Sequence, residues 1–304
     1  MSLFPRVAEN YPSGLPEHQD GEIFYVNYNE GTDSIAGGRG RRREKPFASI
    51  AYALTQCSDD HNDVIYVTLS VHVEDQPIVV SKRGVQILGL PKNTPHAQQA
   101  RTWIFPDAHT TGGVFTISAG DVVIKNFMFW STAGQPCIDF TSEATAVRVT
   151  IDQCSFHVGS YGIQTGLLGA GAINAPSHYL TITNCLFDPG LTSGGIQMLS
   201  NGSWNLIADN FFEYVPGPVI DFNILANSAG SRILRNQILL PADDTVGDGI
   251  YIATGNTRCV VADNDCNDGT PTALGNNPYI DVDNLSMWFR NTCSGVGFTD
   301  VAPA

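Results

Sequence analysis

The segment Val149-Thr-Ile-Asp-Gln153-Cys-Ser recurs along the chain, for example as Leu180-Thr-Ile-Thr-Asn184-Cys-Leu and Leu206-Ile-Ala-Asp-Asn210-Phe-Phe. Each copy alternates between apolar and polar residues and then reaches an amide side chain, which is typical of a short β-strand that ends in a turn. Seven copies follow one another at intervals of 26 to 31 residues. A repeat of this length predicts a solenoid, in which each repeat forms one coil and covers the next.

The amide residues that end these strands are expected to stack. Asn adopts a left-handed turn conformation at low cost, and in a parallel stack the same position recurs about 4.8 Å further along. The side-chain amides of neighbouring coils can then bond to one another. We therefore predict a buried ladder of Asn126, Asn184, Asn210, Asn236, Asn264 and Asn291.

Other short apolar strands lie between and before the repeats, so we predict an all-β, single-stranded parallel β-helix of about eight to nine coils. The apolar spacing of Pro46-Phe-Ala-Ser-Ile-Ala-Tyr-Ala-Leu54 favours a short helix that caps the open end. Residues 1–21 then form an extended arm, and 22–62 hold an N-terminal strand, a basic loop and the capping helix. Residues 63–295 form the β-helix, and 296–304 are a C-terminal tail.

The beginning of this stack resembles a known superfamily. Glu44-Lys-Pro-Phe-Ala-Ser-Ile, Asp63-Val-Ile-Tyr-Val, Val73-Glu-Asp-Gln-Pro-Ile-Val-Val and Val85-Gln-Ile-Leu-Gly resemble the start of right-handed parallel β-helix proteins, which include pectate-lyase-like enzymes and bacteriophage tailspikes. The resemblance extends over residues 22–295 and implies a right-handed stack. It does not imply one function, because such stacks carry lyases, hydrolases, esterases, adhesins and inert virion parts.

Composition excludes several classes of protein. The chain has 304 residues and a net charge of −14, and 15% of its residues are charged while 42% are apolar. The aromatic content and low charge disfavour a disordered chain, and the negative net charge disfavours a nucleic-acid binder. No stretch approaches the roughly 18 apolar residues of a membrane span, and the first residues lack the apolar core of a secretory signal. We expect neither a nucleic-acid nor a membrane partner.

Neither a disulfide framework nor a metal site is expected. The seven cysteines form no CxxC pair, which favours reduced and packed thiols. The acidic turns Asp59–Asp63 and Asp243–Asp248 are candidates to hold Ca²⁺, but neither has the spacing of an EF-hand loop, so turn formation is the favoured interpretation. The seven histidines are scattered. We therefore predict no metal and no cofactor.

Two columns of equivalent positions point to the outer surface. The residue before the amide alternates in sign over the last four copies, which favours a charge ladder that fixes the register. The residue three before the amide should also face outward, yet in these copies it is large and apolar. Because an exposed apolar strip usually marks an interface, we predict contact with a symmetric neighbour, most simply in a trimer. The strip consists of Ile207, Ile233, Val261 and Trp288, and the alternative is that the tail or a loop covers it.

Two further groups of residues are candidates for chemistry. Asp221 and Asp281 share a predicted outward column two coils apart, hence roughly 10 Å, just beyond the range of an inverting glycosidase pair. A solvated face is the favoured interpretation there. The second group is a basic loop that suits an acidic protein surface or an anionic glycan, with a flexible solvated insertion as the alternative; it contains Arg39, Arg41, Arg42, Arg43 and Lys45.

The motifs that the resemblance implies for an enzyme are missing. The Asn-Thr-Asp and Gly-His-Gly strings of polygalacturonases and the Asp-Pro-His-Glu string of alginate epimerases do not occur in the chain. We therefore predict a virion structural protein, a head decoration or spike made in the host cytoplasm and attached to a capsid or tail protein through the arm. The alternative is a polysaccharide-degrading tailspike-type depolymerase or a pectate-lyase-like lyase or hydrolase, with a host surface glycan as its partner.

Overall fold

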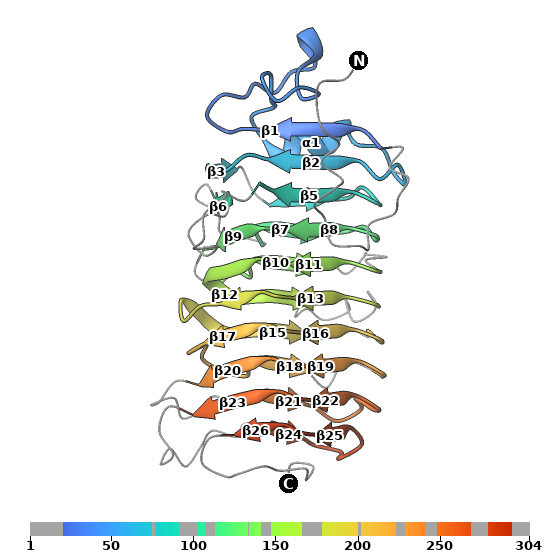
Figure 1. Ribbon diagram of the computed structural model, residues 1–304, viewed down its shortest axis with the longest axis vertical. Coiled ribbons are helices and arrows are strands. Elements are labelled where there is room, and N and C mark those ends of the chain that lie inside the picture. Colours follow the sequence, from blue (N-terminus) through green and yellow to red (C-terminus); the bar gives the residue numbers. More distant parts are fainter. Residues whose placement is uncertain are drawn as a thin grey trace.

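The computed structural model describes residues 21–74, 77–90, 102–106, 113–132, 134–140, 147–165, 178–199, 202–222, 229–240, 248–268 and 279–293. Strands from successive coils pair in parallel and build one elongated stack (Figure 1). Residues 1–20 of the expected arm and the expected tail 296–304 lie outside the described residues.

Three parallel sheets form the walls of the stack. Sheet 1 contains ten strands in the order β1 (Ile23–Val26), β2 (Val64–Val67), β5 (Gln86–Gly89), β8 (Val123–Lys125), β11 (Thr150–Asp152), β13 (Thr181–Thr183), β16 (Leu206–Ala208), β19 (Arg232–Leu234), β22 (Val260–Ala262) and β25 (Met287–Phe289).

Sheets 2 and 3 are joined because one long strand, β12 (Ser155–Thr165), pairs in both. The other strands of sheet 2 are β3 (Val71–Glu74), β6 (Thr102–Pro106), β9 (Phe127–Trp130), β14 (Leu186–Phe187), β17 (Phe211–Glu213), β20 (Gln237–Leu240), β23 (Asp265–Asp268) and β26 (Thr292–Cys293). Those of sheet 3 are β4 (Ile78–Val80), β7 (Phe115–Ile117), β10 (Ile138–Phe140), β15 (Leu191–Met198), β18 (Ile220–Phe222), β21 (Ile250–Ile252) and β24 (Tyr279–Asp281).

One helix covers the N-terminal end of the stack. In α1 (Ile50–Gln56), the side chain of Ser49 accepts a hydrogen bond from the backbone N–H of Tyr52 and so caps the first turn. Ile50, Ala53 and Leu54 are buried, and the helix packs against β1, β2 and β4. Within the described residues, no helix has the length and apolarity to cross a membrane.

The interior is filled by side chains of the same kind stacked from coil to coil. Phe129, Phe156, Phe187 and Phe212 form one such stack, with ring centroids 5.3, 4.8 and 4.4 Å apart. Parallel strand register produces this arrangement, because equivalent residues lie one strand spacing apart and offset-stacked rings fit that spacing.

The apolar strip that the sequence suggested is part of this core. Ile207, Ile233 and Val261 are 0% exposed and Trp288 is 8% exposed. Strand pairing sets Ile207 level with Ile182 and Ile233, and all three point inward. The prediction that these side chains form an exposed oligomer interface is therefore wrong. The trimer stays a prediction, and these residues do not provide its contact surface.

The amide ladder forms in only part of the predicted column. The side-chain Nδ2 of Asn210 donates to Oδ1 of Asn236, that of Asn236 to Asn264, and that of Asn264 to Asn291, over 2.9–3.0 Å. All four residues are buried. Asn126 and Asn184 are not members, because the pairing of β13 with β16 sets Asn184 level with Asp209 instead of Asn210.

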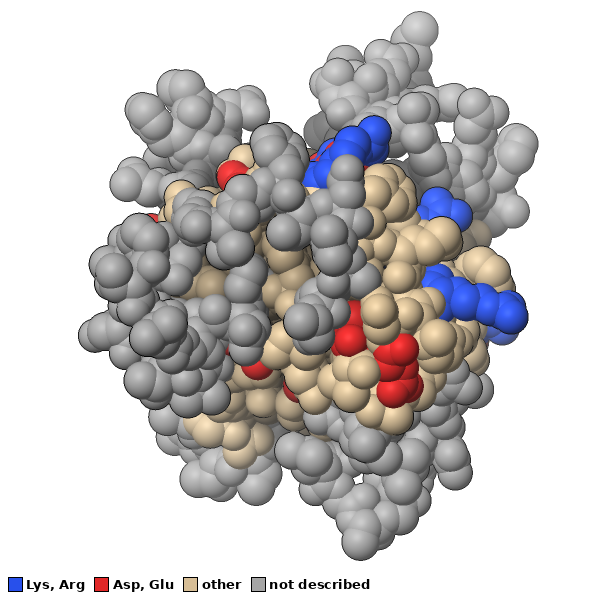
Figure 2. Space-filling view, turned by 90° about the horizontal axis from the view of Figure 1, so that it is seen from below, with Lys and Arg blue, Asp and Glu red and all other residues tan. Residues whose placement is uncertain are grey.

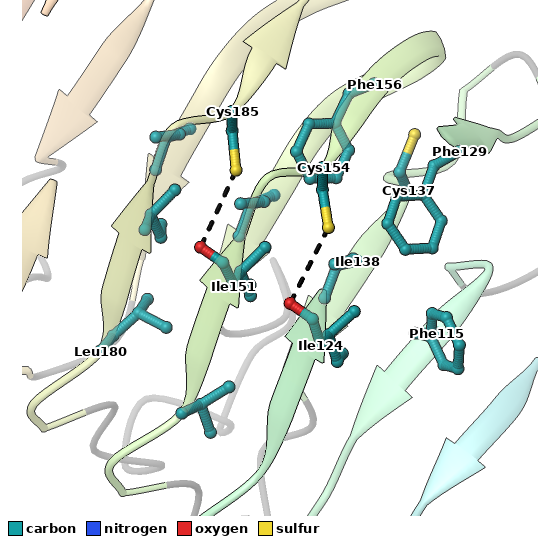
Figure 3. Packing of buried hydrophobic residues seen from close by; sticks show 14 of the residues in the cluster. Phe115, Ile124, Phe129, Cys137, Ile138, Ile151, Cys154, Phe156, Leu180 and Cys185 are labelled. Carbon is teal, nitrogen blue, oxygen red and sulfur yellow. Dashed lines mark hydrogen bonds between the residues drawn. The ribbon is translucent and has the colours of Figure 1, made fainter. Parts of the chain in front are cut away.

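Cysteines occupy the corner position in the coils before the ladder. The thiol of Cys154 donates a weak hydrogen bond to the carbonyl of Ile124, and that of Cys185 to the carbonyl of Ile151, each over 3.8 Å (Figure 3). Asn210 donates in the same way to the carbonyl of Ile182 over 3.0 Å. Cysteine and asparagine therefore occupy the same corner position in different coils, and both donate a side-chain hydrogen bond to a backbone carbonyl of the preceding coil.

The residue before this corner position always has a left-handed backbone. Its φ lies between 53° and 65° in Asn126, Gln153, Asn184, Asp209, Arg235, Asp263 and Arg290. In the C-terminal coils these residues pair by charge, with Arg235 2.7 Å from Asp209 and Arg290 2.7 Å from Asp263. Charged side chains of both signs are visible on the described surface when the stack is seen from its C-terminal end (Figure 2).

Candidate functional site

A row of polar side chains runs along the outer face of sheet 3. In β10 and β18 the central residue is an Asp between two core residues, so Asp139 and Asp221 face away from the interior. Strand pairing sets these aspartates in one column with the middle residues of the neighbouring strands. We call this column the polar row; it contains Thr116, Asp139, Gln164, Gln197, Asp221 and Tyr251.

Hydrogen bonds link the middle of the polar row. Gln164 Nε2 donates to Gln197 Oε1 over 2.7 Å, and Gln197 Nε2 donates to Asp221 Oδ2 over 3.1 Å and to the Tyr161 hydroxyl over 3.0 Å. Gln197 therefore uses both of its amide protons, and the Tyr161 hydroxyl proton can be donated to a ligand.

The position of Tyr161 depends on the glycine opposite it, Gly194, which has no side chain. It lies on β12 opposite Gly194 of β15, where a Cβ would be only 2.7 Å from the tyrosine ring. Only glycine leaves room for the ring at this point, so Gly194 sets the position from which the hydroxyl reaches Gln197. Burial raises the pKa of Tyr161, and the nearby charge of Asp221 adds to this effect. The hydroxyl therefore remains protonated at neutral pH.

Asp139 is a buried member of the polar row. It is 4% exposed, and among the described residues its Oδ1 has no hydrogen-bond partner. Burial raises the pKa of Asp139 to about 6, although the backbone N–H of Phe140 stabilises the charged form. Gly113 lies directly against it, since a Cβ there would be 3.2 Å from the Asp139 Cβ. Asp139 is thus a buried carboxyl that can exchange a proton near neutral pH.

Asp281 does not belong to the polar row. In the pairing of β21 with β24, Ile280 lies opposite Tyr251 and Asp281 lies opposite Ile252, so the Asp281 side chain points inward. Its Oδ2 accepts hydrogen bonds from the backbone of Ser286 over 3.0 Å and from Trp288 Nε1 over 3.1 Å. The predicted Asp221–Asp281 pair is therefore wrong, and Asp281 supports the last coil.

The two aspartates that do share the row are too far apart for paired-carboxylate catalysis. Three strand spacings separate Asp139 from Asp221. At about 4.8 Å per spacing the separation is about 14 Å, beyond the roughly 9.5 Å upper limit of an inverting glycosidase. Thr116, Asp139, Gln197 and Asp221 are only 4–7% exposed. The geometry of the polar row does not fit a glycosidase that uses two carboxylates.

Sequence reasoning missed a cluster of aromatic side chains on the outer face of sheet 2. Trp103, Phe105, Trp130 and His157 are all half-buried, and their planes lie within 21° of one another with neighbouring centroids 5.4–6.4 Å apart. His157 Nδ1 lies 3.0 Å from Asp188 Oδ2. β12 carries both His157 and Gln164, so the aromatic cluster and the polar row share one strand.

In the first acidic turn, Asp59–Asp63, carboxylates accept hydrogen bonds from nearby backbone N–H groups. Asp59 accepts a hydrogen bond from the backbone of Arg83, while Asp63 accepts from the backbones of Glu22 and Ser58. Among the residues that the structure describes, no group of three or more His, Cys, Asp or Glu side chains could hold a metal ion. The second turn, Asp243–Asp248, lies outside the described residues except for Asp248.

Comparison with known proteins identifies the fold. No protein-family model matches the chain, and no curated protein matches its sequence. Among solved structures, a rhamnogalacturonan lyase matches with a TM-score of 0.53 and 13% identity over 91% of this chain and 75% of its own. The pectin methylesterase PemA from Erwinia chrysanthemi matches with a TM-score of 0.50 and 8% identity over 91% and 90%. The fold is a right-handed parallel β-helix.

These identities establish the fold of this β-helix and nothing about its chemistry. The structure of Geobacillus virus E2 ORF18 also matches, with a TM-score of 0.48 and 10% identity over 80% of this chain and 53% of its own. That similarity is too low to bear on function. The activity of this β-helix has to be argued from its own side chains.

Proposed function

We propose that the protein is a glycan-binding β-helix and that the polar row on sheet 3 is its binding surface. The observation that carries this proposal is the linked set of Gln164, Gln197, Asp221 and Tyr161, in which planar amide and carboxylate groups have fixed orientations. Such groups donate and accept in pairs, which suits the paired hydroxyls of a sugar.

The charge of the site favours a neutral glycan. The polar row contains two carboxyl groups and no basic residue, and the whole chain has a net charge of −14. A polyuronate would be repelled by both. The aromatic cluster of Trp103, Phe105, Trp130 and His157 offers an apolar surface on the adjoining sheet, where the C–H face of a sugar ring can pack.

Titration calorimetry with neutral and uronic-acid oligosaccharides tests this proposal. A neutral oligosaccharide should bind, and Gln197→Ala should weaken binding at least about tenfold, because three hydrogen bonds that orient the row are lost. Gln237→Ala is the matched control, since Gln237 is an exposed residue of β20 on sheet 2. Gln164→Ala replaces the first variant if that one fails to fold. Equal affinities in Gln197→Ala and Gln237→Ala, or binding by uronic-acid chains alone, would contradict the proposal.

A second candidate function is acid–base catalysis on a polysaccharide, as in a depolymerase or lyase. Asp139 favours it, because a buried carboxyl whose pKa lies at about 6 can both accept and donate a proton near neutral pH. Purified protein incubated with neutral and acidic polysaccharides should then release reducing ends or unsaturated products that absorb in the ultraviolet. Asp139→Asn should abolish this activity. Turnover that persists in Asp139→Asn would remove Asp139 from the reaction.

The virion role expected from the sequence remains a proposal alongside these two. A glycan-binding rod attached to a capsid or tail protein would combine a structural role with recognition of a host surface. Co-sedimentation of the protein with capsids, and its loss on deletion of residues 1–21, is the observation that would support it. A chain that never associates with capsids would count against it.

A further inference from the structure

Unpaired positive charge is concentrated in one segment of the molecule. The described residues include 13 Lys and Arg, of which seven form an ion pair with a carboxylate. Four of the remaining six belong to a single loop; they are Arg39, Arg42, Arg43 and Lys45. The paired residues elsewhere hold coils or turns together, so these four cations need a different explanation.

The segment is a defined hairpin and not a loose insertion. Gly40 N–H donates to the Lys45 carbonyl over 2.7 Å, and Lys45 N–H donates to the Arg42 carbonyl over 3.0 Å. Tyr25 of β1 donates to the Gly40 carbonyl over 2.7 Å and so fixes the hairpin to the first strand of sheet 1. Gly40 has a φ of 76°, and the ring of Phe47 fills the space that its Cβ would need.

Within this hairpin Arg41 is bound to the stack, whereas Arg42 and Arg43 are exposed. The Arg41 guanidinium forms an ion pair with Glu22 and lies 5.7 Å from the ring centroid of Phe24, which ties it to the stack. Arg42 and Arg43 are exposed at the turn, and among the described residues neither has a carboxylate partner. The hairpin therefore presents two guanidinium groups from an anchored base at the N-terminal end of the molecule.

We propose that this basic hairpin, residues Gly40–Lys45, docks into a carboxylate-lined pocket of a partner protein. Arg guanidinium groups match carboxylates in bidentate pairs, and they match phosphates equally well. The charge around the hairpin is what favours a compact acidic pocket over an extended polyanion. The segment from Gly37 to Lys45 carries five positive charges and one negative charge, which leaves a net charge of about −18 on the rest of the chain.

That surrounding charge limits the size of the anion. A nucleic acid or polyuronate longer than the hairpin would continue over the rest of a chain whose net charge is about −18, and carboxylates within the Debye length of about 8 Å would repel it. A compact acidic pocket meets only the hairpin. This inference does not depend on the glycan proposal, because the hairpin lies on β1 while the polar row begins on β7.

Binding of three anionic probes, measured by fluorescence anisotropy at physiological salt, tests the proposal. The probes are a short poly-glutamate peptide, a heparin oligosaccharide and a short duplex DNA. We expect the peptide to bind best, and Arg42→Glu combined with Arg43→Glu to weaken it by at least about tenfold. Arg232→Glu with Arg258→Glu is the matched control, because these are exposed, unpaired cations elsewhere on the stack and the change in net charge is the same.

Three outcomes would overturn the proposal. Tighter binding of heparin or duplex DNA than of the peptide would identify an extended polyanion as the ligand. Equal losses in the two double variants would show that net charge, and not the hairpin, governs binding. Absence of binding by all three probes would show that the hairpin is no anion site. Arg41 stays unchanged in every variant, because its ion pair with Glu22 belongs to the fold.

Discussion

Two stacks of polar side chains run along this β-helix, and they differ in what their hydrogen-bonding groups do. The ladder of Asn210, Asn236, Asn264 and Asn291 points inward, and its amide groups bond to one another and to backbone carbonyls. The polar row faces outward, leaves Asp139 Oδ1 without a partner among the described residues and raises the pKa of that carboxyl. A stack whose polar groups are all hydrogen-bonded stabilises the fold. A buried polar group without a partner lowers the stability of the fold, so its presence marks a candidate functional site.

The largest effect should follow from breaking the inner stack. Asn236 accepts from the backbone and side chain of Asn210 and donates to the Ile207 carbonyl and to Asn264. Asn236→Ala leaves several of these buried groups without partners, so we expect the free energy of unfolding to fall by about 3–5 kcal/mol. Chemical denaturation measures this, and a loss below about 1 kcal/mol would mean that water replaces the missing amide.

The outer stack should respond in the opposite direction, and its response should depend on pH. Because the folded-state pKa of Asp139 is about 6 against an ordinary 3.8, the folded state loses stability as the pH rises from 3.8 to about 6, and the full cost is present above the folded pKa. Asp139→Asn should therefore raise the free energy of unfolding at pH 8 by up to about 3 kcal/mol, and this gain should vanish as the pH falls below about 4.

Denaturation curves of wild type and Asp139→Asn across this pH range make the measurement. Asp265→Asn is the control, because Asp265 is an exposed carboxyl on β23. A stabilisation by Asp139→Asn that does not change with pH would contradict the assigned burial of the charge.

The difference between the two stacks also explains how far the sequence could be interpreted. The repeat, the apolar alternation and the capping helix are local patterns, so they predicted a stacked parallel β-helix. The register between successive coils, in contrast, could not be predicted from local patterns. In the coils of Asn184 the amide residue has the left-handed backbone and a cysteine follows it, but in the coils of Asn210 a charged residue has that backbone and the amide follows.

Aligning amide with amide therefore shifted the C-terminal coils by one residue. The side-chain direction of a strand alternates with a period of two, so this shift moved Ile207 and Ile233 from the core to the surface in the prediction. The same kind of error occurred where Tyr279-Ile-Asp was matched to Val219-Ile-Asp-Phe, which placed Asp281 in the wrong column. Asp221 was placed in an outward column correctly, but nothing in the sequence showed its hydrogen bond to Gln197 or the bonds from Gln197 to Tyr161 and Gln164.

The smallest effect should come from converting the cysteine part of the corner into the asparagine part. Cys185 already donates its backbone N–H to Asn210 Oδ1 over 2.9 Å, which is the contact that Asn210 makes with Asn236. In Cys185→Asn, the new amide should donate to the Ile151 carbonyl and to Asn210 Oδ1, as Asn210 does with Ile182 and Asn236. The loss of a small apolar group offsets these bonds, so we expect a change in the free energy of unfolding of less than about 1 kcal/mol in either direction.

The reverse exchange supplies the contrast. Asn236→Cys removes an acceptor that the neighbouring asparagine requires, so it should approach the loss expected for Asn236→Ala. If Cys185→Asn were as destabilising as Asn236→Cys, the corner would be specified by the volume of its side chains and not by their hydrogen bonds. If both exchanges were neutral, the ladder would contribute no more than the weak thiol contacts do, and the distinction between a satisfied and an unsatisfied stack would not account for the stability of this fold.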